Sequence, residues 1–273
     1  MYYGMIFLLF VFNTVLAQSD YVEKELVVVI TSYNNKDWYK RNLDSVYCQK
    51  YKNYEVIYVD DCSTDGTGDL VEQYSIESGQ SHRTTIIRSG MRQGALAHIY
   101  RAVHSCDDHK IILQTDGDDW FVHDQVFTRI NQEYQNPNVW MTYGQFRYYP
   151  SGAIGWSQDY PRHCIKFNLY RKHSWVACQI RTFYAGLFKK IRYEDCLYKG
   201  EFFRMACDKV FMYPMLEMSG GRFKFISDVL YEYNRMNAIN NDKVDKAYQV
   251  MLAEFIKWMP PYAPLGISEV TWI

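Results

Sequence analysis

The sequence predicts an α/β fold with one doubly wound, mostly parallel sheet. The first observation is that apolar runs alternate with helical segments, at the spacing of βαβ units, from Glu25 to about Asn138. The second is that the first run, Leu26–Ile30, is apolar throughout, as is typical of a strand buried on both faces. The third is that polar clusters follow three of the strands, at the edge where open α/β sheets bind ligands.

The strand Leu26–Ile30 opens a regular alternation of helices and strands. Thr64 or Asp65 is expected to cap the second helix, because a short side-chain oxygen there accepts hydrogen bonds from the first free amides. The elements expected after the first strand are a helix over 37–47, a strand over 55–59, a helix ending near 74, a strand over 84–87, a helix over 94–103 and a strand over 110–115.

The alternation fades after Asn138, so the second half is predicted only coarsely. No linker rich in Gly, Ser or Pro divides the chain, and we expect one domain over 24–235 followed by a C-terminal helical tail over 236–273. The expected elements are strands over 140–149 and 222–233, a loop over 151–161, a mainly helical region over 165–213 and a terminal helix over 243–258.

The N-terminal residues differ in composition from the rest. Met5–Ala17 is apolar apart from two residues, and its length and small residues near the end fit a signal peptide, although no Lys or Arg precedes it. It is short for a transmembrane helix. We expect residues 1–17 to be a signal peptide, which implies a lumenal or secreted protein, or a short anchor, which implies membrane association through the N-terminus. A buried N-terminal segment is the third alternative.

The composition argues against two classes of ligand, nucleic acid and structural zinc. The 273 residues carry 30 basic and 31 acidic side chains, and this balance gives no electrostatic basis for nucleic acid as a partner. The seven cysteines include no C-x-x-C pair, which argues against a structural zinc site, and their odd number leaves at least one free thiol.

The most distinctive motif is the acidic cluster 116–119, Asp-Gly-Asp-Asp, at the end of the strand over 110–115. Carboxylates this close repel one another unless a cation or a hydrogen-bonding ligand lies among them, and oxygen ligands suit Mg²⁺ or Mn²⁺. A solvated Asp-Gly turn is the alternative. Polar residues over 31–34 and at Asp60-Asp61 follow two other strands, so three strand ends are expected to converge on one crevice.

These segments carry a family resemblance. VVVITSYN (27–34), YVDDCSTDGT (58–67) and TDGDD (115–119), in this order and at these separations, resemble family 2 glycosyltransferases of the GT-A fold. The resemblance covers about residues 26–130 closely and extends loosely to about 235. It implies a single Rossmann-like GT-A domain with an acceptor-side helical region, and an enzyme of the hexosyltransferase type.

The resemblance implies a nucleotide site at the first two strand ends. Tyr33 and Asp61 are expected near the base, with Asp60 in support, and a carboxylate that accepts a hydrogen bond from the uracil N–H makes uridine the expected base. Gly94 begins a helix that is expected to line the same pocket, the alternative being an ordinary helix start. The nucleotide-binding residues implied are Thr31, Tyr33, Asn34, Asp60, Asp61, Gly94, Asp116 and Arg235.

The cluster 116–119 corresponds to the DxD motif of this family. The resemblance implies that Asp116 faces the ribose and that Asp118 ligates Mn²⁺ or Mg²⁺ bridging the diphosphate. Asp116 and Asp119 are further candidate ligands, with Asp119 alternatively an outer partner. Arg235 is expected near the diphosphate, and a solvated loop arginine is the alternative.

Sugar transfer to a hydroxyl calls for a carboxylate general base. Members of the family generally invert the anomeric centre and place this base late in the domain, often in an acidic pair at a helix start. Cys207-Asp208 is the best match here, which makes Asp208 the candidate base even though Cys207 replaces the first acid. Glu194-Asp195 is a rival pair, and a plain surface aspartate is the alternative.

The expected function is metal-dependent transfer of a sugar from a nucleotide-sugar donor, a UDP-sugar, to a glycan, protein or lipid acceptor. A glycoside hydrolase also needs two carboxylates, but it does not need a nucleotide pocket at the strand ends. The alternative from another class is a catalytically silent protein that binds a nucleotide sugar or a glycan, which Cys207 suggests because the family often has an acid there.

Overall fold

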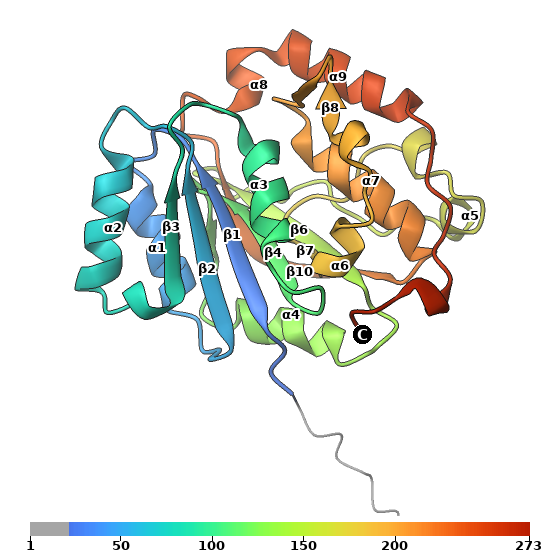
Figure 1. Cartoon of the computed structure of the whole chain (residues 1–273), viewed down its shortest axis with the longest axis horizontal. Helices are drawn as coiled ribbons and strands as arrows, with labels where there is room; N and C mark the ends of the chain where they lie inside the picture. The colour runs from blue at the N-terminus through green and yellow to red at the C-terminus, as the bar shows by residue number, and fades with distance from the viewer. Residues whose placement is uncertain (1–21) are drawn as a thin grey trace, which may run out of the picture.

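The computed structural model describes residues 22–273 and is built around a central mixed sheet (Figure 1). Its strands are Leu26–Ser32 (β1), Tyr54–Asp60 (β2), Thr84–Arg88 (β3), Ile111–Asp116 (β4), Trp120–Phe121 (β5), Met141–Tyr149 (β6), Arg181–Tyr184 (β7) and Phe223–Asn234 (β10). They lie in the order β3-β2-β1-β4-β7-β6-β10-β5. A separate hairpin joins Leu197–Tyr198 (β8) and Glu201–Phe202 (β9).

The helices alternate with the first strands as predicted and then continue through the second half. They are Tyr39–Tyr47 (α1), Thr67–Glu77 (α2), Ala95–His104 (α3), Val126–Tyr134 (α4), Arg162–Lys166 (α5), Ala185–Phe188 (α6), Cys207–Ser219 (α7), Asn241–Val244 (α8) and Lys246–Trp258 (α9). Short 3₁₀ turns cover Ser81–Arg83, Tyr170–Lys172, Tyr193–Cys196 and Ile267–Glu269.

The order of the first four strands creates a switch point between β1 and β4. The chain moves from β1 to β2 to β3 in one direction and returns through α3 to β4, which pairs with the other side of β1. Right-handed crossovers then place α1 and α2 on one face and α3 on the other, where α3, α6 and α7 form the layer in front of the sheet (Figure 1). Open α/β sheets bind ligands at such a change of direction, so the carboxyl ends of β1 and β4 are where a ligand site is expected.

The buried side chains explain why the first half was predictable. Residues 26–30 of β1 are at most 1 % exposed, as a strand covered on both faces should be. The predicted cap of α2 is formed in part: Asp65 Oδ1 accepts a hydrogen bond from the Thr67 amide at 3.0 Å, while Gly66 occupies the capping position.

The expectation of a mainly helical region over 165–213 was wrong. This region contains β7, which lies inside the sheet and pairs antiparallel with both β4 and β6. All four residues of β7, Arg-Thr-Phe-Tyr, are buried. Because two of them are polar, the segment lacks the continuous apolar run that predicts a buried strand. The sheet is therefore mixed, with parallel pairs in β3-β2-β1-β4 and β6-β10 and antiparallel pairs around β7 and β5.

The C-terminal residues pack against the domain. The helix expected over 243–258 is divided into α8 and α9, and these helices lie at the end of the molecule where the parallel strands β1, β2 and β4 finish (Figure 1). Leu252 and Ile256 of α9 and Trp272 near the C-terminus are buried in the same hydrophobic core as the sheet.

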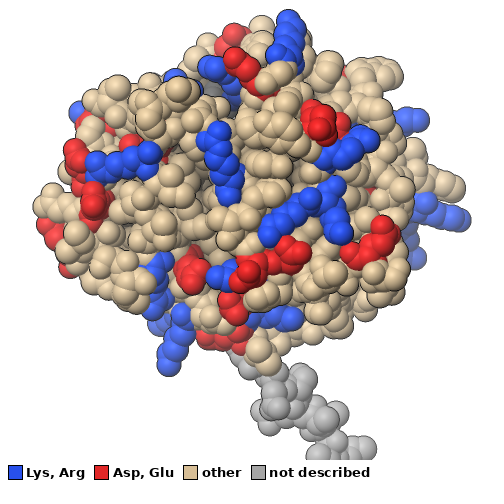
Figure 2. All heavy atoms as spheres, viewed as in Figure 1, with Lys and Arg blue, Asp and Glu red and all other residues tan. Residues whose placement is uncertain are grey.

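The predicted signal peptide or anchor, residues 1–17, lies outside the described residues. Among residues 22–273, none of the helices has both the length and the apolar character needed to cross a bilayer. On the face shown in Figure 2, basic and acidic side chains are interspersed and neither sign forms a continuous field.

Candidate functional site

Three strand ends bring the predicted residues together. β1 lies between β2 and β4, and its register places Ser32 opposite Asp60 on one side and Thr31 opposite Asp116 on the other. Thr31 and Asp60 are buried, whereas Asp116 is partly exposed. The convergence expected from the three polar clusters is therefore present in the fold.

Gly117 lets the acidic turn pack against β1. Its amide donates to the Thr31 carbonyl at 2.9 Å, and a Cβ at this position would lie 2.7 Å from Ser32 Cβ. Any side chain here would push the turn away from the sheet, because atoms this close overlap. Glycine therefore fixes the position of the two carboxylates that flank it, Asp116 and Asp118.

Asp118 is held by the chain segment that follows β10. Its Oδ2 accepts a hydrogen bond of 2.7 Å from Asn237 Nδ2, which also lies 3.1 Å from Asn35 Oδ1. Burial, followed by the charge of Asp116, raises the pKa of Asp118 to about 6. The pKa of Asp116 is also raised by burial, against the opposing charge of Arg181. The two carboxylates thus lack part of the positive charge that would keep them ionised.

This pair fits a divalent cation that is shared with a phosphate group. Among the described residues there is no group of three or more His, Cys, Asp or Glu side chains placed to hold a metal ion by themselves. Mg²⁺ commonly binds through one or two carboxylates and completes its coordination with water and substrate phosphates. Asp116 and Asp118 supply this number of ligands and the unbalanced negative charge that goes with them.

Asp119 has a different surrounding from its two neighbours. It is buried, with Oδ2 accepting from the Tyr231 hydroxyl and Oδ1 from the Asn234 amide, both at 2.7 Å. Both oxygens are thus used to join the acidic turn to β10. These protein donors favour the alternative of an outer partner for Asp119, and its role toward a metal stays a prediction.

Asp61 is enclosed by three donors. Its Oδ1 accepts from the Gln93 amide at 2.7 Å and lies 2.7 Å from His98 Nε2, while Oδ2 accepts from the Gly94 amide at 2.8 Å. Burial raises the pKa of Asp61, but the hydrogen bonds from His98 and the two amides outweigh burial, so the pKa lies below its usual value. Oδ2 keeps a free acceptor position for a ligand N–H.

Gly94 allows this arrangement just before α3. Its φ of +87° lies in the left-handed region that favours glycine, and its amide points to Asp61. The structure therefore joins the loop before α3 to the end of β2, as expected for one pocket.

Asp60 and Asn34 take part in hydrogen bonds between the loops after β1 and β2. Ser63 donates to Asp60 Oδ1, and its Oγ accepts from the Asn34 amide at 2.8 Å. Asn34 Oδ1 in turn accepts from the Thr64 amide at 2.8 Å. These bonds join the loop after β1 to the loop after β2, which agrees with a supporting role for Asp60, while contact of Asn34 with a nucleotide stays a prediction.

Tyr33 lies against an arginine that follows β3. The guanidinium carbon of Arg92 is 3.7 Å from the centre of the Tyr33 ring, within the range of a cation–π contact. Tyr33 is partly exposed, and Arg92 precedes the two amides that hold Asp61. An aromatic ring, a cation and a carboxylate therefore lie close together beyond the carboxyl ends of β1 and β2.

Asp208 stands at the first turn of α7 and is connected to the acidic turn. Arg181 of β7 donates from Nη2 to Asp208 Oδ2 at 3.0 Å and from Nη1 to Gln114 Oε1 at 3.2 Å. Gln114 Nε2 donates to Asp116 Oδ1 at 3.1 Å. The candidate base and the candidate metal ligand are thus joined through two buried side chains.

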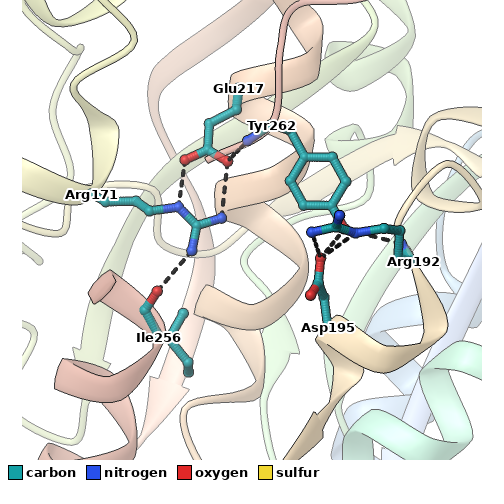
Figure 3. Close-up of polar contacts among 6 residues, drawn as sticks. All are labelled: Arg171, Arg192, Asp195, Glu217, Ile256 and Tyr262. Atoms are coloured by element: carbon teal, nitrogen blue, oxygen red, sulfur yellow. Dashed lines mark hydrogen bonds and ion pairs between the residues drawn. The ribbon is translucent and has the colours of Figure 1, made fainter. Parts of the chain in front are cut away.

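The rival base Asp195 lies in a different cluster, shown in Figure 3. Its Oδ2 accepts from Arg192 at 2.7 Å and from the hydroxyl of Tyr262. In the same view Arg171 binds Glu217, at the far end of α7 from Asp208, and donates to the Ile256 carbonyl at 2.7 Å. Asp195 therefore belongs to the contacts that fasten the C-terminal residues to the domain.

Arg235 follows β10 at the same end of the sheet. Its amide donates to the Tyr149 carbonyl at 2.9 Å, and its guanidinium carbon lies 5.8 Å from the Tyr233 ring. Asn237, two residues later, reaches Asp118. The segment that carries Arg235 thus borders the acidic turn, while its proximity to a diphosphate stays a prediction.

With this geometry in place, comparison with known proteins identifies the family. The sequence profile of glycosyl transferase family 2 matches residues 27–197. The chain belongs to glycosyl transferase family 2. This confirms the resemblance found in the motifs, and the mixed sheet confirms the expected GT-A type of α/β fold.

Relatives of this family 2 member share only part of their length with it. The glycosyltransferase GlyA of Streptococcus pneumoniae is 25 % identical over 63 % of this chain and 26 % of its own length. The putative teichuronic acid biosynthesis glycosyltransferase TuaG of Bacillus subtilis is 34 % identical over 36 % of this chain and 38 % of its own. The chain therefore spans less than two fifths of the length of these two proteins.

Solved structures agree with the fold. TarS of S. aureus, residues 1–349 with UDP-GlcNAc, has a TM-score of 0.59 at 17 % identity and covers 78 % of this chain and 59 % of its own. The mannosyltransferase PcManGT of Pyrobaculum calidifontis, with GDP-Man and Mn²⁺, has a TM-score of 0.52 at 17 % identity and covers 84 % and 60 %.

Several residues at the candidate site of this family 2 member were not predicted from the sequence. Arg181 lies in the strand that was expected to be helical, and Asn237 is far from its partner along the chain. Asn42 of α1 donates a hydrogen bond of 2.7 Å to the Asp119 carbonyl and so holds the backbone of the acidic turn. His98 lay in the segment predicted to line the pocket, and its position four residues after Gly94 was the only available signal.

Proposed function

We propose that the protein transfers a sugar from a nucleotide-sugar donor, a UDP-sugar, to an acceptor hydroxyl, with inversion at the anomeric carbon. One observation carries this proposal: Asp116, two residues before Asp118 in the acidic turn, is joined through Gln114 and Arg181 to Asp208, which stands at the start of a helix. A carboxylate pair for a diphosphate-bound cation and a third carboxylate for proton removal are the parts that this reaction needs.

The first strand ends supply the nucleotide site. Tyr33 and Arg92 offer a flat, charged surface for the base, and Asp61 Oδ2 has a free acceptor position for an N–H such as that of uracil. Asp60, Thr31 and Asn34 hold the two loops in register. We expect Asp116 to face the ribose and Arg235 to lie near the diphosphate.

Asp118 and Asp116 would hold Mn²⁺ or Mg²⁺, which supplies positive charge to the leaving nucleoside diphosphate. This agrees with the raised pKa of both carboxylates, since their burial and mutual repulsion favour a bound cation over ionised side chains alone. Asn237 orients Asp118 from the segment after β10.

Asp208 would accept the proton of the attacking hydroxyl. Its Oδ2 is engaged by Arg181, and no hydrogen bond among the described residues ends on Oδ1, so Oδ1 is available to an acceptor. The new glycosidic bond forms as the bond to the diphosphate breaks on the opposite face, and the proton moves to Oδ1. Inversion follows when a single displacement occurs in this way.

Similar proteins support parts of the proposal. A relative from Escherichia coli, 31 % identical over 39 % of this chain and 41 % of its own length, is named UDP-Glc:alpha-D-GlcNAc-diphosphoundecaprenol beta-1,3-glucosyltransferase. Its name combines a UDP-sugar with a lipid-linked acceptor. For this chain we propose a glycan, protein or lipid acceptor with a free hydroxyl.

The proposal is tested with a panel of nucleotide sugars and Mn²⁺, by measuring released nucleoside diphosphate. We expect turnover with a UDP-sugar and loss of turnover when the metal is chelated. The second candidate, a catalytically silent protein that binds a nucleotide sugar or a glycan, is suggested by Cys207 beside Asp208. Binding of UDP-sugars without release of diphosphate across the panel and with any acceptor would favour it.

The role of residues 1–17 is a separate proposal. Their apolar sequence supports a signal peptide, and hence a lumenal or secreted protein, or a membrane anchor. Expression of the full chain in a secreting host, followed by N-terminal sequencing, distinguishes cleavage near Ala17 from an intact N-terminus that sediments with membranes.

A further inference from the structure

We propose that Arg181 is a positioning residue that holds Asp208 in the orientation needed for catalysis and couples it to the acidic turn. This inference rests on the proposed function, since it assigns Arg181 to the same site. Arg181 contacts neither the donor nor the acceptor in this role. It acts through the two carboxylates that do.

The contacts of Arg181 extend from one carboxylate to the other. Its Nη2 lies 3.0 Å from Asp208 Oδ2, and its Nη1 lies 3.2 Å from Gln114 Oε1. Gln114 uses its amide nitrogen to reach Asp116 Oδ1 at 3.1 Å. The planar guanidinium fixes the angle between these two directions, which a flexible lysine side chain does not do.

Burial makes these contacts specific. Arg181 is 8 % exposed and Gln114 is 2 % exposed, so water has little access to replace a hydrogen bond that either side chain loses. A buried guanidinium is tolerated when it is paired and hydrogen-bonded, and Asp208 provides that charge. Asp208 itself is partly exposed, as a group that meets an acceptor must be.

The backbone of Asp208 has an independent anchor. At the other end of α7, Glu217 receives Arg171 through both carboxylate oxygens, at 2.5 and 2.9 Å, and Arg171 also donates to the Ile256 carbonyl (Figure 3). This pair fastens α7 to α9 without Arg181. Loss of Arg181 should therefore release the side chain of Asp208 rather than the helix that carries it.

The arrangement leaves one oxygen of Asp208 for chemistry. Arg181 occupies Oδ2, and no other hydrogen bond among the described residues reaches the Asp208 carboxylate. A carboxylate fixed at one oxygen presents the other in a defined direction, which is the condition for efficient proton removal from a bound hydroxyl. Without Arg181, the carboxylate is free to rotate and to interact with other cations.

The test compares Arg181→Gln and Arg181→Lys with Arg147→Gln as a matched control. Arg147 is also a sheet arginine that pairs with an acid, Glu232, but it is exposed and does not join the acidic turn. We expect Arg181→Gln to lower kcat for transfer by about 10- to 100-fold, with little change in the KM for the donor. Arg181→Lys should recover part of this loss, and the control should match the wild type.

A double-mutant cycle with Asp208→Asn separates positioning from a general structural effect. If Arg181 acts through Asp208, adding Arg181→Gln to Asp208→Asn should reduce the residual transfer by less than about threefold, because the two effects are not additive. Multiplicative losses would overturn the inference, as would unchanged or increased kcat in Arg181→Gln. Circular dichroism monitors folding, and Arg181→Lys replaces Arg181→Gln in the cycle if the latter does not fold.

The outcomes also separate this inference from the proposed function. A wild-type chain that binds UDP-sugar but never transfers it overturns both. An active wild-type chain with an unaffected Arg181→Gln variant overturns only the role of Arg181. Donor turnover with loss of transfer confined to the Arg181 and Asp208 variants supports both.

Discussion

His98 Nε2 lies 2.7 Å from Oδ1 of Asp61, and both side chains are buried. The histidine on α3 thus holds a carboxylate at the end of β2, across the loop whose amides complete the set of donors. This contact connects the element after the third strand to the part of the crevice where a nucleotide base is expected. It determines which lone pair of Asp61 remains for a ligand.

Replacement of His98 by Ala should weaken UDP binding. The loss of a buried donor leaves Asp61 short of one hydrogen bond and free to turn, which costs about 1–3 kcal/mol. We expect the Kd for UDP with Mn²⁺ to rise by about 5- to 150-fold in calorimetry, with a smaller change for His98→Gln, which keeps an N–H. The exposed His82 serves as the control through His82→Ala. Equal affinity of the wild type and His98→Ala would contradict the assignment.

Metal binding should depend on pH through Asp118. Its pKa is raised to about 6, so protons compete with Mn²⁺ below this pH and the affinity falls as the solution is acidified. The sign for stability is opposite in the metal-free chain. Because the folded state holds more protons than the unfolded state between the ordinary pKa and about 6, stability falls as pH rises through that window.

Thermal unfolding with and without Mn²⁺ measures this dependence. The rise in Tm caused by Mn²⁺ and UDP should be larger at pH 7.5 than at pH 5, and Asp118→Asn should remove most of the rise at both. Asp118→Asn should also abolish UDP-sugar turnover while the circular dichroism spectrum stays that of the wild type. Full activity of this variant would refute the metal site.

Asp208→Asn should separate binding from transfer. The amide keeps the size of the side chain but accepts no proton, so transfer should fall by about 100-fold or more. UDP binding should stay within about twofold of the wild type in calorimetry, because in the proposed mechanism Asp208 acts on the acceptor hydroxyl and not on the donor. Asp195→Asn, in the rival pair, should retain transfer. Loss of UDP binding in Asp208→Asn would show that this residue belongs to the donor site instead.

The residues that were predictable and those that were not differ in how the chain brings them together. β1 and β4 showed in the sequence because their apolar side chains are consecutive, and Asp60 and Asp116 follow directly from the strands. β7 was missed because Arg181 and Thr182 make up half of it and are buried as polar side chains. The hydrophobic pattern of a sequence indicates which apolar side chains are buried. It does not show which polar side chains are buried by hydrogen bonding to a distant partner.

Contacts across long separations explain the rest. Asn237 reaches Asp118 from 119 residues away, and Arg181 reaches Gln114 from 67 residues away. Neither side chain belongs to a motif, and each takes its role from the strand beside which it lies. The alternation of strands and helices could predict where the site forms, but not which distant side chains complete it.

Gly117→Ala should disturb the site through one methyl group. The added Cβ would lie 2.7 Å from Ser32 Cβ and 2.8 Å from Ser32 Oγ, so the acidic turn must move away from β1 and carry Asp116 and Asp118 with it. Overpacking of this kind costs about 1–3 kcal/mol. We expect a lower Tm and a weaker response to Mn²⁺ and UDP, measured by thermal shift.

Two variants decide whether the methyl group acts as described. Gly90→Ala is the matched control, because nothing lies within 4 Å of a Cβ at this position, and it should behave as the wild type. Ser32→Gly removes the two nearest atoms that the added Cβ would meet and leaves Asn35 Nδ2 at 3.0 Å, so the double variant should regain part of the lost Mn²⁺ response relative to Gly117→Ala alone. If Gly117→Ala binds UDP and Mn²⁺ as the wild type does, the contact between the acidic turn and β1 does not set the spacing of Asp116 and Asp118.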